Sequence, residues 1–215
     1  MSINRRDALV LTAAASAASL AGFGSAFAAE GDMHDVAKLM QPNGVADRPI
    51  GAEDAKVTFI EYASPTCPHC ASFHVNVYPA LKEQYIDTGK ITFILRPFVR
   101  NVLDAVVFML AETAEDNETY NNIVATYFKT QNQWALSDKP RDELLAIALQ
   151  LGFTQESFEA ALTNQELFDG MESLREQALN EFDLTGTPTF YVNGKQLAGD
   201  KTLEELAAEI DPQLG

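Results

Sequence analysis

Cysteine is scarce in this sequence: only Cys67 and Cys70 occur among its 215 residues. In an oxidising compartment cysteines usually act as structural cross-links spread along a chain, and two cysteines at this spacing exclude such a framework. A disulfide between them would close a very small ring, whereas a disulfide stabilises a fold more when it closes a longer loop. The presence of the pair is therefore better explained by its chemistry than by any stabilising effect.

Basic residues are also few. The chain has 15 lysines and arginines against 31 aspartates and glutamates, a formal net charge of −16, without a block of like charge long enough to predict a disordered tail. We therefore expect no binding to nucleic acid and no attraction to anionic lipid. The acidity indicates solubility and has no catalytic meaning. The length fits one compact unit, or one domain with a sizeable insertion.

One alanine-rich apolar run, from Ala8 to Phe27, follows Arg5 and Arg6 and ends in the small-residue pattern Ala26-Phe27-Ala28. This arrangement predicts an export signal at residues 1–28, cleaved from a soluble and periplasmic mature protein. The arginine pair also fits the twin-arginine route, although the apolar residue usual two places after such a pair is missing. A permanent membrane anchor is the alternative, but two glycines interrupt a segment that is short for a bilayer span.

The two cysteines bracket a proline and a histidine in the motif Cys67-Pro68-His69-Cys70. A β-favouring run at residues 57–62 precedes the motif, and residues 71–85 after it carry apolar side chains at helical spacing. The pair is thus predicted at a point where a strand is followed by a helix. Free backbone N–H groups and the positive end of the helix dipole stabilise an anion there, so Cys67 is the candidate thiolate, with a lowered pKa.

The remaining chain predicts strands on either side of a long helical segment. Residues 30–54 are polar and rich in turns, with 35–40 as a short strand or turn. The other expected elements, in chain order, are a strand at 55–62, a helix at 67–87 kinked by Pro79, a strand at 90–96, an all-helical block at 101–182, a hairpin of strands 187–192 and 195–198 around Asn193-Gly194, and a final helix capped by Thr202.

This order, with the cysteine motif opening the first helix and Gly186-Thr187-Pro188-Thr189 opening a later strand, resembles the DsbA family of bacterial thiol-disulfide oxidoreductases. The resemblance covers residues 35–212. It implies an α/β fold, the thioredoxin fold with an inserted all-helical block. The thioredoxin-like domain would then comprise residues 29–100 and 183–215, and the inserted helical domain residues 101–182.

The resemblance also implies roles for single residues. In this family the proline matching Pro188 is cis and lies beside the cysteine pair, which exposes the backbone of Thr187 for strand-like pairing with a substrate peptide. An ordinary trans proline at a strand start is the alternative. Family members carry a buried acid at the position of Glu61, which could accept a proton from the second cysteine; the alternative is a solvent-facing residue of an alternating strand.

The residues between the cysteines indicate the direction of the reaction. Pro68-His69 is the dipeptide typical of DsbA itself, whereas thioredoxins typically carry Gly-Pro, so the motif favours an oxidase. His69 is expected to direct a hydrogen bond or positive charge toward the Cys67 sulfur, and an exposed residue at the helix start is the alternative. His34 and His74 are interpreted as structural or surface residues.

The predicted function is a periplasmic, monomeric enzyme that introduces disulfides into unfolded or thiol-bearing exported proteins. It would need no cofactor beyond the redox-active Cys67–Cys70 disulfide, and a membrane partner linked to quinones would reoxidise it, as in the family. A reductase or isomerase of the same fold is the nearest alternative. A second is a periplasmic metal-binding protein in which Cys67, Cys70 and His74 bind zinc or copper, although no fourth ligand lies nearby in the sequence.

Overall fold

The computed structural model describes residues 31–215, so the predicted export signal at residues 1–28, with its arginine pair, lies outside the described residues. Within the described part, a single mixed sheet holds five strands: β1 (Pro49–Gly51), β2 (Val57–Ala63), β3 (Ile91–Pro97), β4 (Thr189–Val192) and β5 (Lys195–Ala198). Their order across the sheet is β1-β3-β2-β4-β5. Only β2 and β3 run parallel; the other neighbours are antiparallel.

The central strand β2 is buried along almost its whole length, which explains why its sequence, Val-Thr-Phe-Ile-Glu-Tyr-Ala, is a nearly continuous apolar run. Its one charged residue, Glu61, is paired in register with Leu95 of β3 and Phe190 of β4. The carboxyl end of this strand leads directly into the loop before the two cysteines. The sheet therefore places the motif at the end of its most buried strand.

The hairpin between β4 and β5 is confirmed. Asn193 and Gly194 both have positive φ, 45° and 93°, the backbone conformation that a two-residue turn of this kind requires and that Asn-Gly readily adopts. A side chain on Gly194 would also place its Cβ 2.5 Å from the carbonyl oxygen of His34. The turn thus needs glycine for two independent reasons.

The segment before β2 contains a short helix where a strand or turn was expected. Residues 35–40, predicted as a strand or turn, contain the short helix α1 (Val36–Leu39), whose N-terminus is capped by the Asp35 carboxylate accepting from the amides of Ala37 and Lys38. The three-residue strand β1 was not predicted, because its pairing with β3 depends on a partner more than forty residues away.

The helix expected over residues 67–87 is divided into three pieces: α2 (Pro68–Asn76), α3 (Tyr78–Leu81) and the π-helical turn η1 (Lys82–Ile86). The division occurs at Val77, whose φ is −115°. Pro79 stands in the first turn of α3, where its missing N–H costs nothing, whereas in a continuous helix it would leave the carbonyl four residues earlier without a donor. A kink was predicted, and the structure has a break.

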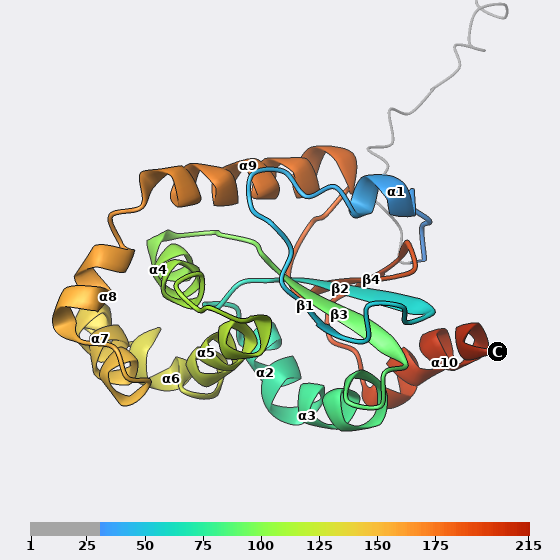
Figure 1. Cartoon of the computed structure of the whole chain (residues 1–215), viewed down its shortest axis with the longest axis horizontal. Coiled ribbons are helices and arrows are strands. Elements are labelled where there is room, and N and C mark those ends of the chain that lie inside the picture. Colours follow the sequence, from blue (N-terminus) through green and yellow to red (C-terminus); the bar gives the residue numbers. More distant parts are fainter. Residues whose placement is uncertain (1–30) are drawn as a thin grey trace, which may run out of the picture.

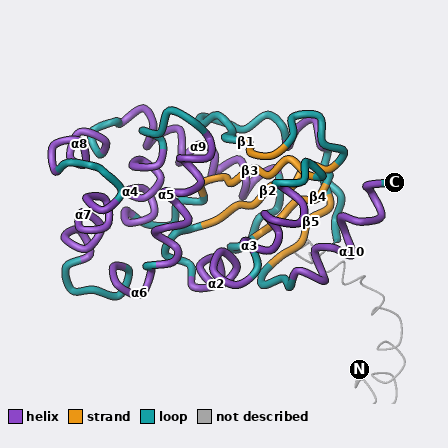
Figure 2. Tube along the Cα trace, turned by 60° about the horizontal axis from the view of Figure 1, so that its bottom comes forward, coloured by secondary structure: helices purple, strands orange, loops and turns teal. Residues whose placement is uncertain are grey.

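Between β3 and β4 the described chain is helical. The helices are α4 (Val102–Ala111), α5 (Asn117–Lys129), α6 (Gln131–Trp134), α7 (Pro140–Gln150), α8 (Gln155–Ala161) and α9 (Gln165–Glu181), and α10 (Leu203–Leu214) follows β5. Figures 1 and 2 show α4 to α8 gathered at the end of the molecule opposite α10. In Figure 1, α9 runs along one side of the sheet, and α2, α3 and α10 lie on the other.

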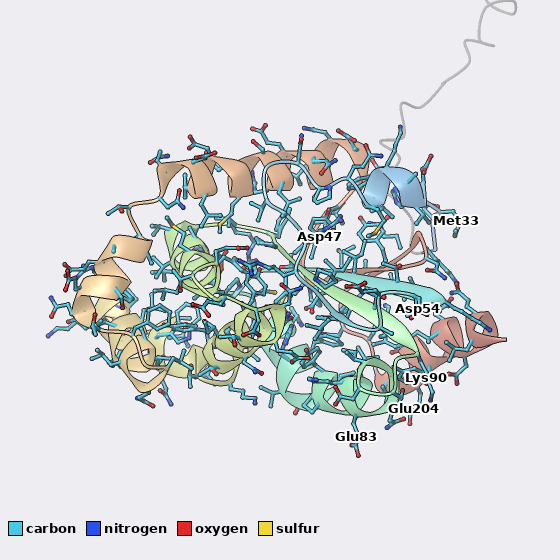
Figure 3. The ribbon with its side chains drawn as sticks, in the orientation of Figure 1. Met33, Asp47, Asp54, Glu83, Lys90 and Glu204 are labelled. Carbon is cyan, nitrogen blue, oxygen red and sulfur yellow. The ribbon has the colours of Figure 1, made fainter. Side chains whose placement is uncertain are left out.

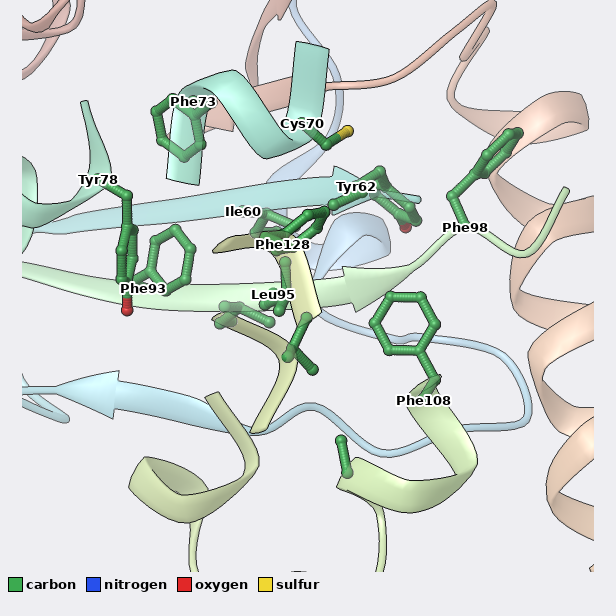
Figure 4. Close-up of a cluster of buried hydrophobic side chains, with 14 of the residues drawn as sticks. Ile60, Tyr62, Cys70, Phe73, Tyr78, Phe93, Leu95, Phe98, Phe108 and Phe128 are labelled. Atoms are coloured by element: carbon green, nitrogen blue, oxygen red, sulfur yellow. The ribbon is translucent and has the colours of Figure 1, made fainter. Parts of the chain in front are cut away.

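Aromatic rings fill the space between α2 and the sheet. Figure 4 shows Cys70 on α2, which runs over β2, together with buried rings from α2, α3, β3 and α5. Phe73 of α2 lies 4.8 Å from Phe190 of β4, measured between ring centroids. None of the helices within residues 31–215 combines the length and the apolar character needed to span a bilayer.

Candidate active site

Cys67 occupies the N-cap position of α2, with extended backbone angles, and Pro68 follows at the first helical position. Proline suits that position because the amide that it lacks would have no partner inside the helix. The next backbone amides, those of His69 and Cys70, lower the pKa of Cys67 by stabilising the charged form of its sulfur. The strand-to-helix junction predicted from the sequence is therefore present, and the free N–H groups of the helix surround the first cysteine.

The environment of Cys67 favours its thiolate. Its pKa is lowered to about 5, first because the Cys70 side chain donates a hydrogen bond to its sulfur and further because the amides of Cys70 and His69 do so; burial opposes these effects. Both cysteines are present as free thiols and buried, Cys67 with 3% of its surface exposed. At neutral pH the first cysteine is thus a thiolate, which is the nucleophilic form.

Cys70 has the opposite character. Burial raises its pKa well above the usual value, and the hydrogen bond to Cys67 and the negative charge of Glu61 raise it further. It is completely buried, so it stays a thiol while Cys67 is ionised. Two cysteines with oppositely shifted pKa values are suited to thiol exchange, in which one sulfur leaves readily and the other holds a proton.

The loop before β4 contacts the first cysteine. The peptide bond between Thr187 and Pro188 is cis, as the resemblance implied. The Cys67 sulfur lies 3.1 Å from the carbonyl oxygen of Thr187, to which it donates a hydrogen bond when it is protonated. The structure therefore brings together two motifs that are about 120 residues apart in the sequence.

Glu61 is buried, as predicted, with none of its surface exposed. Its Oε2 lies 2.9 Å from Nε2 of His74, which is also buried, on α2. The ring of His74 stacks on Phe128 of α5, with centroids 4.2 Å apart and planes 14° apart. The sequence interpretation of His74 as a structural or surface residue missed this pairing, because nothing in the spacing of the two residues shows that β2 and α2 face each other at this point.

The His69 ring lies elsewhere than predicted. Its Nδ1 is 2.7 Å from Oδ2 of Asp200, in the loop after β5, and the two side chains are 62% and 60% exposed. His69 lowers the pKa of Cys67 through its backbone amide. Since a side chain at the start of a helix projects outward, the geometry matches the alternative of an exposed residue, with Asp200 as a partner that the sequence did not indicate.

Two side chains from the helical segment hold the loop that precedes Cys67. The buried Asp104 carboxylate of α4 accepts hydrogen bonds from the Ser64 hydroxyl at 2.8 Å and from the Thr66 amide at 2.7 Å. The Gln131 amide of α6 donates to the carbonyl oxygens of Pro65 and Cys67 at 2.7 and 2.9 Å. Neither residue was singled out from the sequence, because only the tertiary fold places α4 and α6 beside this loop.

Shallow grooves lie on both sides of α2. One, of about 430 Å³, is lined by α2 residues such as Phe73 and by residues 200–203 after β5. The other, of about 370 Å³, lies between α2 and the segment joining α5 and α6, near Phe128 and Lys129. Both grooves border α2, the helix that Cys67 caps, and Cys67 itself lines neither of them.

The described residues do not support the metal-binding alternative. Within residues 31–215 no group of three or more histidine, cysteine, aspartate or glutamate side chains is arranged to hold a metal ion. His74, the expected third ligand, has its Nε2 engaged by Glu61.

Comparison with known proteins agrees with this geometry. The family model described as Thioredoxin matches residues 43–212. A protein of Rickettsia bellii named as a protein-disulfide oxidoreductase is 33% identical over 175 residues, 77% of this chain and 68% of that protein. A relative of the same name from Rickettsia conorii is 31% identical, and the match covers 78% of this chain but only 60% of that relative. The crystal structure of alpha-DsbA1 from Wolbachia pipientis superposes with a TM-score of 0.78 at 30% identity, covering 84% of this chain and 96% of that one.

Proposed function

Because the chain belongs to the thioredoxin family and has the fold and cysteine pair of its DsbA-type oxidoreductases, we propose that it introduces disulfides into exported proteins by dithiol–disulfide exchange. The observation that supports this proposal most is the opposite shift of the two cysteine pKa values, about 5 for Cys67 and well above the usual value for Cys70. A stabilised Cys67 thiolate is a good leaving group, which favours transfer of the disulfide to a substrate.

In the proposed reaction, a substrate thiolate attacks the Cys67 sulfur of the oxidised enzyme. The bond between Cys67 and Cys70 breaks, and Cys70 takes up a proton because its thiol form is favoured by burial. A second substrate thiolate then attacks the substrate sulfur of the mixed disulfide, and Cys67 leaves as a thiolate. The substrate has lost two electrons and gained a disulfide, and the enzyme holds two reduced cysteines.

Thr187 and Pro188 are proposed as the substrate-binding residues. The contact of the Thr187 carbonyl with the Cys67 sulfur at 3.1 Å supports this assignment, because the main chain of a substrate bound to Cys67 would pass close to Thr187. Pairing of the substrate with the backbone of Thr187 would fix the attacking sulfur without requiring a particular substrate sequence. Such binding suits an enzyme that acts on many unfolded chains.

Among the remaining predicted residues, Glu61 is proposed as the group that exchanges a proton with Cys70, because its buried carboxylate acts electrostatically on that thiol. Pro68 and His69 are proposed to shape the start of α2, where the His69 amide supports the thiolate. The cysteine pair itself is the redox centre, and the proposed reaction uses no other cofactor.

The proposal also covers place and partners. Residues 1–28 would direct export to the periplasm. The enzyme would act there as a monomer, and a membrane redox partner would reoxidise it. The thioredoxin-like part would comprise residues 29–100 and 183–215 and the inserted helical part residues 101–182. The position of α4 to α9 between β3 and β4 supports this division.

The reduction potential of the cysteine pair tests the direction of the reaction. Equilibration in glutathione buffers, followed by alkylation of the free thiols, should give a value near about −120 mV, the potential of the strong oxidant DsbA. A value near about −270 mV, the potential of thioredoxin, would show that the protein is an exported reductase. Reshuffling of a scrambled substrate faster than oxidation of a reduced one would instead identify an isomerase.

A further inference from the structure

The buried side chains of Glu61 and His74 form one hydrogen bond with each other, and each also has a second polar atom. Oε2 of Glu61 and Nε2 of His74 contact each other at 2.9 Å, whereas Oε1 of Glu61 and Nδ1 of His74 have no hydrogen-bond partner among residues 31–215. The two side chains are 0% and 2% exposed. Buried polar atoms without partners cost free energy and are uncommon. A pair kept only for stability would be expected to satisfy these atoms or to be replaced by apolar residues.

The surroundings fix the histidine ring tightly. It stacks on Phe128 of α5, lies 4.8 Å from the ring of Tyr78 on α3, and contacts Phe73 of its own helix edge-on at 5.4 Å. An ionised carboxylate can only accept, so the ring donates to Glu61 through Nε2. The ring therefore holds one carboxylate oxygen in place and leaves the other free.

The titratable groups around the pair come from four elements. Cys70 shares α2 with His74, Glu61 is on β2, Tyr78 is on α3, and Glu118 of α5 lies further away, with its charge reaching Tyr78. Burial and these two carboxylates raise the pKa of Tyr78 above its usual value, so it remains protonated. Cys70 is the group among them whose proton must move during the reaction.

We propose that His74 is a positioning residue for proton exchange at Cys70: it holds Oε2 of Glu61 and so keeps the unpartnered Oε1 available to exchange a proton with Cys70. This inference rests on the proposed function, and it identifies His74 as the residue that orients the Glu61 carboxylate. When a substrate thiolate attacks Cys67, the electron pair of the broken S–S bond passes to Cys70, and the proton on Oε1 follows it. The carboxylate that results is stabilised by the N–H of His74.

Reoxidation reverses the proton movement. The Cys67 thiolate first attacks the disulfide of the oxidant; that S–S bond breaks, one sulfur forms a mixed disulfide with Cys67, and the other is released as a thiolate. Oε1 of Glu61 then takes the proton of the Cys70 thiol, and the Cys70 thiolate attacks the Cys67 sulfur. The remaining sulfur of the oxidant leaves as a thiolate, and the enzyme regains its disulfide. Glu61 thus regains during reoxidation the proton that it gave to Cys70 during the oxidation of the substrate.

The experiment follows the reduced protein in stopped flow with an excess of a chromogenic aromatic disulfide. Release of the first aromatic thiolate reports attack by Cys67, and release of the second reports attack by Cys70 on the mixed disulfide. In His74→Phe, which keeps an aromatic ring but loses the donor, the second phase should slow at least about tenfold, since general acid–base catalysis contributes roughly 10² to 10⁴-fold. The first phase should stay within about twofold of the unmodified protein.

Two matched variants separate positioning from packing. His74→Gln retains an N–H donor at the place of Nε2 and should restore most of the second phase. Glu61→Gln should lose the second phase at least as strongly as His74→Phe. If His74→Phe does not fold, His74→Asn takes its place, because its shorter amide cannot reach Oε2, and the same slowing is expected.

The pH profile gives a readout that a purely structural role would not change. With Glu61 present the rate of the second phase should depend only weakly on pH, whereas in Glu61→Gln it should rise about tenfold per pH unit because the thiolate forms only by loss of its proton to solvent. Equal second-phase rates in His74→Phe, His74→Gln and the unmodified protein would overturn the inference. If the second-phase kinetics are as expected but the reduction potential of the cysteine pair lies near that of thioredoxin, only the proposed oxidase function is refuted.

Discussion

At the scale of single residues, the two cysteines have opposite protonation states although only two residues lie between them. The difference arises because Cys67 receives hydrogen bonds at the start of α2 while Cys70 is enclosed by the sheet and by α5. The Cys70 thiol is the largest contributor to the low pKa of Cys67. The acidity of the first cysteine is therefore a property of the pair.

Removing the Cys70 donor should raise the pKa of Cys67. In Cys70→Ala the thiolate absorbance of Cys67 should titrate with a midpoint well above the value of about 5 found with the donor in place. Cys70→Ser keeps a hydroxyl donor at the same position and should remain closer to that value. Identical midpoints in the two variants would show that the helix amides alone determine the acidity.

The same pKa makes the stability of the reduced protein depend on pH. The pKa of Cys67 is depressed on folding from 9.0 to about 5, so its contribution to the free energy of unfolding is fully present above about pH 9 and decreases as the pH falls toward 5. Urea unfolding of the reduced protein, compared with Cys67→Ser, should show a difference that grows from pH 5 to pH 8. A difference independent of pH in this window would contradict the assigned pKa.

At the scale of elements, the helical segment determines the conformation of the loop that carries the first cysteine. Asp104 of α4 accepts from Ser64, from the amide of Thr66 and from the amide of Arg100, and Gln131 of α6 donates to two carbonyl groups of the same stretch. The loop contains no regular structure of its own, so these hydrogen bonds replace the ones that a strand or helix would supply.

Replacement of Asp104 by asparagine tests this arrangement. One carboxylate oxygen becomes an NH₂ group that cannot accept, so at least one buried donor loses its partner, at a cost of about 1–3 kcal/mol in the free energy of unfolding. Chemical denaturation measures the change. Asp116→Asn is the matched control: Asp116 is an exposed N-cap of α5, where asparagine caps equally well, and its unfolding should match that of the unmodified protein within error. A similar loss in both variants would contradict the role given to Asp104.

The elements also show what the sequence could and could not predict. The helix start at the cysteine motif and the Asn-Gly hairpin were predicted because each depends on residues close together in the chain, whereas the cis form of Pro188 was implied by the resemblance to the family. The break at Val77, the pairing of Glu61 with His74 and the contact of His69 with Asp200 depend on which surfaces meet after folding. Apolar spacing gives the face of a helix but not the side chain opposite it.

At the scale of the whole molecule, one buried ion pair joins the N-terminal segment to the sheet. Arg96 of β3, 1% exposed, donates through Nε and Nη2 to the two carboxylate oxygens of Asp47, each at 2.7 Å. It also donates to the Tyr62 hydroxyl at 2.8 Å and to the carbonyl oxygen of Leu39. Figure 3 shows Asp47 between α9 and the sheet, whereas Glu83 lies on the outside.

Loss of Asp47 should therefore be costly. In Asp47→Ala the guanidinium of Arg96 remains buried without its counter-charge, which we expect to lower the free energy of unfolding by about 3–5 kcal/mol. Asp200→Ala removes the contact of Asp200 with His69, whose side chains are 62% and 60% exposed, and exposed pairs of this kind contribute about 1 kcal/mol or less. Equilibrium unfolding of both variants in the oxidised state makes the comparison. Since the two pairs have the same 2.7 Å length, equal losses would show that burial is not what gives the Asp47 pair its strength.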